Sequence, residues 1–375
     1  MSSALHIVSF DIPFPANYGG VIDVFYKITA LHRAGIRIRL HCYRHDRQPA
    51  PELEQYCEEV RYYARASGWS AMIGLKPYIV AGRMSEELIM NLQKDQDPIL
   101  FEGLHTCGIM QDPRLKGRFM AYRESNIEHH YYYHLFKAER NLFKRFYFLA
   151  ESTRLYLFQP VLHHASVLLA VSTGDAGYLS RRFPVKRVEY LPSFHRDDKT
   201  NILPGKGDYA LYQGKLTVPE NLRAAEYLIT RVWRDELPAL VIAGLDPPAK
   251  LQRLAAGRPN IRIISNPTDE EMFRLIREAH VNVMVTFQPT GLKLKLINAL
   301  FNGRFCLVNP PMVAGTTLGT LCTMAGNPIE FREELLRLFA TEFTADEARR
   351  RESLLSGRFS NQNNCISLLE ILNLR

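Results

Sequence analysis

The sequence predicts an α/β protein made of two parallel-sheet domains in tandem. Short apolar runs alternate with amphipathic helical segments, the order that produces a parallel sheet covered by helices. The series stops in a polar stretch with prolines and glycines, residues 192–207, and then begins again. The length of 375 residues exceeds what one compact core usually holds and suits two.

The first domain is expected over residues 1–200. An apolar run at residues 5–10 ends at Asp11, and apolar residues then recur at helical spacing over 21–33. Gly35 ends this helix before a second apolar run. The predicted strands of this domain are 5–10, 36–40, 99–101, 119–122, 167–171 and 188–191.

The second domain is expected over residues 201–355. Asp346 is a plausible cap for a helical tail, and residues 356–375 are expected to return to the first domain as a helix. The two domains should face each other across a cleft, because open α/β sheets bind ligands at the carboxyl ends of their strands. The predicted elements are strands at 209–212, 240–243, 261–264, 281–285 and 305–308, and helices near 220–231, 269–278 and 292–301.

Composition limits the classes of function. Hydrophobic residues at 46% and charged residues at 23% are typical of a folded globular chain. No run approaches the roughly eighteen apolar residues of a spanning helix, no export signal is expected at the start, and the six cysteines lack zinc or disulfide spacing. We therefore expect the reducing cytoplasm as the location. Basic residues exceed acidic ones, 47 to 39, which favours an anionic partner such as a nucleotide, a nucleic acid or a lipid headgroup.

A glycine pair, Gly19 and Gly20, lies between the first predicted strand and helix. Backbone amides there can approach a phosphate, and the helix N-terminus adds positive potential. A tight turn explains the pair equally well on spacing alone, because the three-glycine dinucleotide motif is absent. The position at the end of a strand favours a ligand loop.

Residues 289–303 are the most informative segment. Thr290 is a good helix cap, and Gly291 leaves the backbone free to face a ligand. Lys293 and Lys295 fall in the opening turns, where cations oppose the helix dipole unless an anion binds. The alternative is a pair of exposed lysines that tolerate a small cost.

A further lysine follows the first strand of the second domain. Gly214 permits close approach and Lys215 could meet a phosphate, although a lone loop lysine is usually only solvated. Together with Lys293 and Lys295, Lys215 offers a way to hold a diphosphate leaving group without a metal.

Metal chemistry is not expected. The acidic pair in residues 95–97 precedes an apolar strand rather than following one, so we interpret it as a solvated loop. The adjacent histidines at 129–130 and 163–164 would point apart on a helix, and no histidine, cysteine and carboxylate grouping has metal spacing.

Residues 131–158 hold ten phenylalanine or tyrosine side chains and more basic than acidic residues. A helix of this composition could lie on an anionic membrane, which would make the chain peripheral on the inner face. An ordinary helix with core aromatics explains it equally well. Nucleic-acid binding is not expected, because the basic residues form no continuous stripe. The charged residues are Lys137, Arg140, Lys144, Arg145 and Arg154 against Glu139 and Glu151.

Four segments carry a family resemblance: 15–20 (PANYGG), 123–128 (RESNIE), 212–216 (YQGKL) and 291–303. Over nearly its whole length the sequence resembles a GT-B glycosyltransferase, and more narrowly the retaining family four class of bacterial polysaccharide assembly. The resemblance implies two Rossmann-like domains that face across a cleft. It also implies a UDP- or GDP-sugar donor held mainly by the second domain, a glycan or lipid-linked acceptor on the first, and neither metal nor other cofactor.

The resemblance also implies roles for single residues. Gly19, Gly20 and Lys215 would face the donor diphosphate, Leu292 and Lys293 would donate backbone amides to it, and His105 would lie near the donor sugar. Asn126 and Glu128 would line the acceptor side. The complete candidate set is His105, Lys215 and Lys293 for catalysis, Gly19, Gly20, Gly214, Lys215, Thr290, Gly291, Leu292, Lys293, Lys295 and Asn298 for the donor, and Asn126 and Glu128 for the acceptor.

The sequence departs from the family pattern at two usual glutamates, whose places Thr290 and Asn298 take. Asn298 could bond a ribose hydroxyl, but Thr290 cannot offer a negative charge to an oxocarbenium ion. A basic residue common after Lys215 is replaced near residues 219–221. A metal-independent retaining hexosyltransferase and a weakened nucleotide-sugar binding subunit of another transferase therefore remain the two hypotheses. An epimerase would need the carboxylates that this segment lacks.

Overall fold

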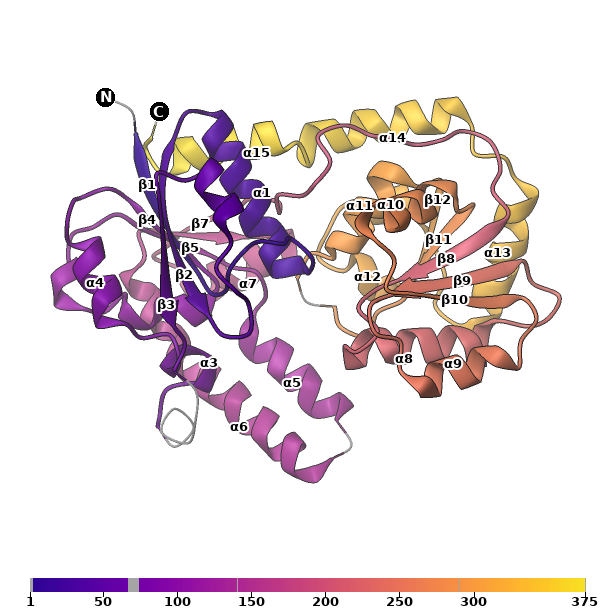
Figure 1. Ribbon diagram of the computed structural model, residues 1–375, viewed down its shortest axis with the longest axis horizontal. Helices are drawn as coiled ribbons and strands as arrows, with labels where there is room; N and C mark the ends of the chain where they lie inside the picture. The colour runs from indigo at the N-terminus through magenta and orange to yellow at the C-terminus, as the bar shows by residue number, and fades with distance from the viewer. Residues whose placement is uncertain (1–2, 67–73, 140, 290, 375) are drawn as a thin grey trace. The chain divides into compact units, whose positions relative to one another are not determined.

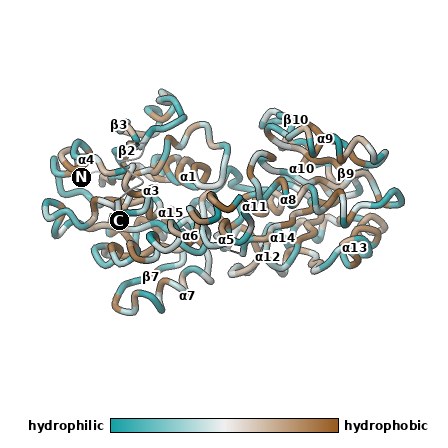
Figure 2. The backbone as a smooth tube through the Cα atoms, turned by 90° about the horizontal axis from the view of Figure 1, so that it is seen from below, coloured by the Kyte–Doolittle hydropathy of each residue, from teal (hydrophilic) through white to brown (hydrophobic). Residues whose placement is uncertain are grey.

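The computed structural model describes residues 3–66, 74–139, 141–289 and 291–374 (Figure 1). The chain forms two compact units. The first comprises Met1–Arg196, Thr290–Leu292 and Phe359–Arg375, and the second comprises Asp197–Pro289 and Lys293–Arg358. Figure 2 shows hydrophobic stretches in both units.

The first unit is built on a seven-stranded parallel sheet of order β3-β2-β1-β4-β5-β6-β7. Its central strands are buried on both faces, because apolar clusters lie under the helices on either side. The strands are β1 (Ala4–Ser9), β2 (Arg37–Arg44), β3 (Glu59–Ala64), β4 (Ile99–Glu102), β5 (Met120–Arg123), β6 (Val167–Ala170) and β7 (Arg187–Tyr190), and the helices are α1 (Gly19–Arg33), α3 (Tyr78–Ala81), α4 (Glu86–Leu92), α5 (Glu128–Ala138), α6 (Leu142–Phe158), α7 (Thr173–Arg182) and α15 (Asn361–Ile371).

The second unit is built on a six-stranded parallel sheet of order β10-β9-β8-β11-β12-β13 around one core. Its strands are β8 (Tyr209–Gln213), β9 (Ala239–Gly244), β10 (Ile261–Ser265), β11 (Val281–Met284), β12 (Phe305–Val308) and β13 (Thr323–Met324). Its helices are α8 (Pro219–Tyr227), α9 (Ala249–Ala256), α10 (Asp269–Glu278), α11 (Leu294–Asn302), α12 (Pro310–Val313), α13 (Pro328–Ala340) and α14 (Ala345–Arg358). Short 3-10 or π segments are η1 (Pro51–Gln55), η2 (Leu104–Ile109), η3 (Pro113–Leu115), η4 (Gln159–His164), η5 (Leu228–Val232) and η6 (Leu318–Leu321).

The strand order places a switch point in each sheet. The chain runs outward from β1 to β3 and then returns beside β1 with β4; in the second unit it runs from β8 to β10 and returns beside β8 with β11. Loops that leave neighbouring strands in opposite directions open a crevice at the strands' carboxyl ends. Residues after β1, β4, β8 and β11 are therefore the ones to inspect.

The predicted fold class of two parallel-sheet α/β units is confirmed, and three local expectations need correction. Asp346 does not cap α14, because Thr344 Oγ1 accepts from the Glu347 amide at 3.2 Å and Asp346 lies in the first turn. Helix α11 begins at Leu294 with Lys293 at its N-cap, and Thr290 lies outside the described residues. The edge strands β3 and β13 were not expected, since neither is a continuous apolar run.

Candidate functional site

The loop between β1 and α1 is held by its own side chains and by one arginine. The Tyr18 hydroxyl donates to Asp11 Oδ2 at 2.7 Å. Arg47 donates to Asn17 Oδ1 at 3.0 Å and to the Pro15 carbonyl, and its guanidinium lies 5.5 Å from the Tyr18 ring centre. These contacts fix the backbone that leads into the glycine pair.

The two glycines at the start of α1 differ in what surrounds them. A Cβ at Gly19 would meet nothing within 4 Å, whereas a Cβ at Gly20 would lie 2.6 Å from Cζ of Phe10. The first turn of α1 contains no acidic residue. Gly19 therefore leaves open space beside the positive end of a helix dipole, and Gly20 accommodates an aromatic ring.

His105 and Glu128 approach each other at the carboxyl ends of β4 and β5. His105 lies in η2 after β4, and its Nδ1 is 3.9 Å from Oε1 of Glu128, the first residue of α5. The Phe10 ring lies 5.3 Å from the His105 ring, so His105 also neighbours the glycine loop. Within the described ranges Nδ1 of His105 has no hydrogen-bond partner.

Burial sets the protonation of this pair. Desolvation lowers the pKa of His105 well below its ordinary value and raises the pKa of Glu128 to about 8. At neutral pH the imidazole is therefore uncharged and the Glu128 carboxyl keeps its proton. The pair can exchange a proton with a bound hydroxyl without leaving an isolated buried charge.

Arg83 is a neighbour that the sequence did not indicate. Its Nε donates to the Phe10 carbonyl at 2.8 Å and its Nη1 donates to the Ile79 carbonyl at 2.7 Å. Burial lowers the pKa of Arg83 to about 10, so it stays charged at neutral pH. No local motif marks Arg83, because its partners come from distant segments.

Asn126, expected on the acceptor side, is half-buried two residues before Glu128.

Asn221 is the centre of the cationic cluster in the second unit. Its Nδ2 donates to the Lys215 carbonyl at 3.1 Å, and its Oδ1 accepts from the Lys295 ammonium at 3.2 Å. A Cβ at Gly214 would come within 3.1 Å of the Asn221 carboxamide. The Lys215 side chain is exposed, and the Lys295 ammonium lies 5.3 Å from the Tyr212 ring centre.

Desolvation destabilises the charged form of the Lys295 side chain. Desolvation, and to a lesser extent the neighbouring Lys293, lowers the pKa of Lys295 to about 8, although Glu220 acts in the opposite direction. The Glu220 carboxylate accepts a hydrogen bond from the Thr286 hydroxyl. A bound anion would relieve the cost that Lys295 carries in its absence.

The predicted donor residues divide between the units. Gly214, Lys215, Lys293, Lys295 and Asn298 belong to the second unit, and Asn298 Oδ1 accepts from Asn302 Nδ2 at 2.8 Å. Gly19, Gly20, Gly291 and Leu292 belong to the first unit, and Gly291 has a φ of +68°, a conformation that favours glycine. Asn221 was missed as a candidate, since its two partners, Lys215 and Lys295, come from segments far apart in the sequence.

A buried ion cluster fixes α1 on the sheet of the first unit. Lys27 Nζ lies 2.6 Å from Glu102 and 3.2 Å from Asp23, and Arg123 Nε lies 3.3 Å from Asp23. Two cations and two anions balance, which avoids an uncompensated charge in the core. Because Glu102 ends β4 and Arg123 ends β5, the cluster positions the loops that carry His105 and Glu128.

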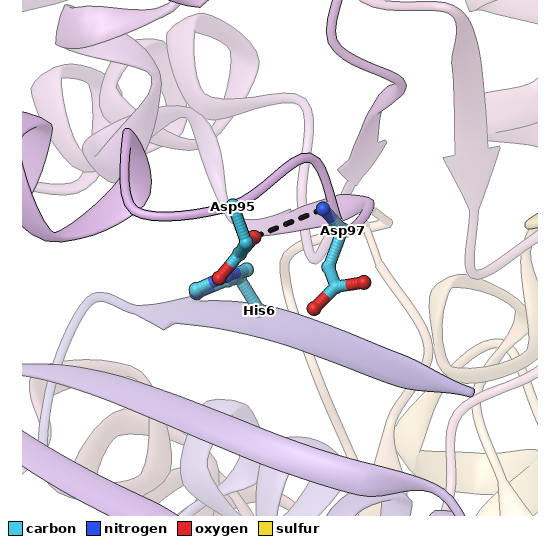
Figure 3. A group of neighbouring side chains, drawn as sticks. All are labelled: His6, Asp95 and Asp97. Carbon is cyan, nitrogen blue, oxygen red and sulfur yellow. Dashed lines mark hydrogen bonds and ion pairs between the residues drawn. The ribbon is translucent and has the colours of Figure 1, made fainter. Parts of the chain in front are cut away.

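The acidic pair at residues 95 and 97 is not a solvated loop, and that expectation was wrong. Figure 3 shows His6, Asp95 and Asp97 next to one another, with Asp95 3.0 Å from His6 Nε2. Asp95 also lies 2.7 Å from Arg39, and Asp97 lies 2.6 Å from the same guanidinium. Arg118 lies 3.3 Å from Asp95. His6, Asp95 and Asp97 have ligand atoms within 4.8 Å of one another, but two arginines already neutralise the carboxylates. Asp95 and Asp97 precede the amino-terminal end of β4, whereas His105 follows its carboxyl end.

Comparisons with known proteins support the architecture. No family model matches the sequence. An uncharacterised 44.6 kDa protein from the cps region of Klebsiella pneumoniae is 25% identical over 352 residues, covering 88% of this chain and 89% of that protein.

Several solved structures share the whole fold. Sucrose-phosphate synthase of Thermosynechococcus elongatus superposes with a TM-score of 0.65 at 15% identity, covering 99% and 98% of the two chains. Anabaena HepE in complex with UDP and glucose gives 0.63 at 11% identity, covering 99% of both. TarM of S. aureus in complex with UDP, fondaparinux and α-GlcNAc-glycerol gives 0.68 at 8% identity, covering both completely. The chain has a GT-B fold. Glycosyltransferases of that fold, with UDP and UDP-glucose complexes among them, are its structural neighbours.

Within the described ranges, every helix of the GT-B chain is too short or too polar to cross a bilayer.

Proposed function

We propose that the chain transfers a hexose from a nucleoside-diphosphate sugar, UDP- or GDP-linked, to a polysaccharide or lipid-linked surface glycan. The single observation that carries this proposal is the cationic cluster around Asn221 at the carboxyl end of β8. It occupies the position where open α/β sheets bind ligands. Support also comes from the UDP and UDP-glucose complexes of structural neighbours and from the cps-region relative.

In the proposed reaction the bond between the anomeric carbon and the diphosphate breaks, and a bond to the acceptor hydroxyl forms on the same face. The departing phosphate oxygen takes the acceptor proton. Lys215, Lys293 and Lys295 stabilise the growing charge together with backbone amides at the start of α11, which makes the step independent of a metal.

The first unit would hold the acceptor. The neutral His105 and the protonated Glu128 offer one acceptor nitrogen and one donor hydroxyl, a combination that suits sugar hydroxyls. Gly19 would let the donor diphosphate approach the N-terminus of α1, because nothing occupies the space beside it.

A second candidate function is a nucleotide-sugar binding subunit that supports another transferase. The observation that favours it is Asn298, which stands where related enzymes carry a glutamate and whose Oδ1 already accepts from Asn302. A chain without that carboxylate keeps the phosphate ligands but has only a neutral amide where a charged group would hold the ribose.

Donor consumption by the purified chain separates the two functions. We expect hydrolysis or transfer from one of UDP-glucose, UDP-galactose, UDP-GlcNAc or GDP-mannose in EDTA, and its loss in Lys215→Ala and Lys293→Ala. Stabilisation by a nucleotide without donor consumption would identify the binding subunit. Indifference to every donor and nucleotide, by both assays, would contradict both functions.

A further inference from the structure

Helices α5 and α6 form a hairpin that extends from the sheet of the first unit (Figure 1). One face of α6 is anchored. Ser152 Oγ donates to the His129 carbonyl at 2.7 Å, and the Glu151 carboxylate accepts from the Tyr78 amide at 2.8 Å. Leu155 on the same face is fully buried in the core. The expected single aromatic helix is thus two helices, and only one side of α6 faces the protein.

The other side of α6 is apolar and exposed. Residues 142, 146, 149 and 157 follow helical spacing, so they form one stripe along the helix. An apolar stripe of this size on a charged surface marks an interaction site. We name it the α6 stripe: Leu142, Phe146, Leu149 and Leu157, exposed by 66%, 71%, 37% and 70%, with Phe143 beside it at 88%.

Within α6 the exposed charged side chains are basic. Lys144 and Arg145 are exposed in the first turn of α6, where cations oppose the helix dipole. The acidic residue within α6, Glu151, is buried against the Tyr78 amide and Arg154. The exposed side chains of α6 therefore include cations beside the apolar stripe and no carboxylate.

The cations are arranged as side chains that reach from an apolar surface to a polar one. The Arg145 guanidinium lies 4.8 Å from the Phe136 ring centre, and the Lys137 ammonium lies 4.5 Å from the Tyr133 ring centre. Long basic side chains of this kind keep their stems on apolar groups and their charges at a headgroup level.

We propose that the α5–α6 hairpin docks on an anionic bilayer, with the α6 stripe in the interface, Lys137 and Arg145 on lipid phosphates, and Lys144 adding positive potential at the start of α6. A second copy of this chain is a poor occupant. A two-fold contact through the α6 stripe would bring Lys144 and Arg145 of one copy close to the same residues of the other, and these like charges repel. A helix of 17 residues is about 25 Å long, so an apolar stripe along it matches a flat surface better than a pocket. This inference concerns where the chain works and does not depend on its reaction.

Co-sedimentation of the full chain with vesicles tests the proposal. We expect vesicles of phosphatidylcholine with 30% phosphatidylglycerol to bind at least about tenfold more tightly than phosphatidylcholine alone, and 0.5 M NaCl to abolish the difference. Phe143→Ser/Phe146→Ser should lower binding to the anionic vesicles at least about tenfold. Lys144→Glu/Arg145→Glu should remove the preference for anionic lipid. Thermal melting should be unchanged in both variants, because all four side chains are exposed.

Two double variants outside the hairpin serve as matched controls. Val185→Ser/Ile329→Ser removes two exposed apolar side chains, and Lys94→Glu/Lys116→Glu reverses two exposed charges. Both should bind anionic vesicles like the unaltered chain. Absence of vesicle binding, equal binding by the hairpin variants, or a dimer in sedimentation velocity that Phe143→Ser/Phe146→Ser dissociates would each overturn the proposal.

Discussion

Lys295 and Asn221 are joined by a 3.2 Å hydrogen bond from the lysine ammonium to the carboxamide oxygen, and the same carboxamide donates to the Lys215 carbonyl. One neutral side chain thereby fixes a half-buried cation of α11 and the loop that presents an exposed one. Desolvation destabilises the charged form of Lys295, and a bound anion would stabilise it.

Asn221→Leu should weaken nucleoside-diphosphate binding by about 10- to 100-fold. The change removes both hydrogen bonds of the bridge, and each such bond to a charged or backbone group contributes about 1 to 2 kcal/mol. Titration calorimetry with UDP and GDP measures the effect. Asn221→Asp keeps the oxygen that accepts from Lys295 and should lose less affinity than Asn221→Leu in the same titration. Equal affinity in the chain and in Asn221→Leu would contradict a role for the bridge.

Binding of the diphosphate should weaken as the pH rises above about 8. The pKa of Lys295 is about 8 in the free chain, and a bound anion raises it, so binding takes up a proton in this range. Calorimetry at pH 8 in buffers of different ionisation enthalpy should report that uptake. Lys295→Arg stays charged and should show a flat profile from pH 7.5 to 9.5; the same slope in that variant would rule out Lys295 as its source.

The two glycines of α1 should respond oppositely to alanine. Gly19→Ala meets open space and should leave the melting temperature unchanged or slightly raised, since alanine favours helix by up to about 1 kcal/mol. In the proposed donor site Gly19 faces the diphosphate, so Gly19→Ala should lower the affinity of the chain for the nucleotide at least about tenfold. Gly20→Ala must displace Phe10 and should cost about 1 to 3 kcal/mol of the unfolding free energy. Unaltered nucleotide affinity in Gly19→Ala would remove that residue from the donor site.

The contribution of Glu128 to the free energy of unfolding should fall as the pH rises from about 4.5 to about 8. Glu128 has a raised pKa of about 8 in the folded chain, so the folded state holds a proton that the unfolded state has lost. One such group costs at most about 1.4 kcal/mol per pH unit in this window. Glu128→Gln mimics the protonated form and should flatten the slope in urea titrations at pH 6 and pH 8.

Glu124, whose pKa is also raised by burial, leaves a residual slope in that variant. The exposed Glu342→Gln is the control and should follow the unaltered chain. If Glu128→Gln and Glu342→Gln gave the same slope, Glu128 would be ionised in the folded chain.

Much of the fold could be predicted because buried parallel strands are continuous apolar runs. The predicted runs 99–101 and 167–171 are examples, and they lie in β4 and β6, two interior strands of the first sheet. The strand β3 was missed because its residues are mostly half-buried at a sheet edge, where polar and apolar side chains alternate. Local composition identifies a strand most clearly when both of its faces are covered.

The candidate site was harder to predict for a related reason. Lys215, Lys293 and Lys295 stand out next to glycines, and their donor role stays a prediction. Asn221 shows no such signal, because its two partners lie on different segments of the second unit. Asp95 was misjudged in the same way, since its partners His6 and Arg39 come from β1 and β2.

The most direct test of the account is the equilibrium affinity of UDP and GDP for the chain in EDTA, compared with Lys215→Ala and Lys295→Met. The account predicts micromolar binding of one nucleotide without any divalent ion and a loss of at least about tenfold in each variant. Binding that requires a divalent cation, or that both variants retain in full, would contradict a diphosphate site made of ammonium and amide groups.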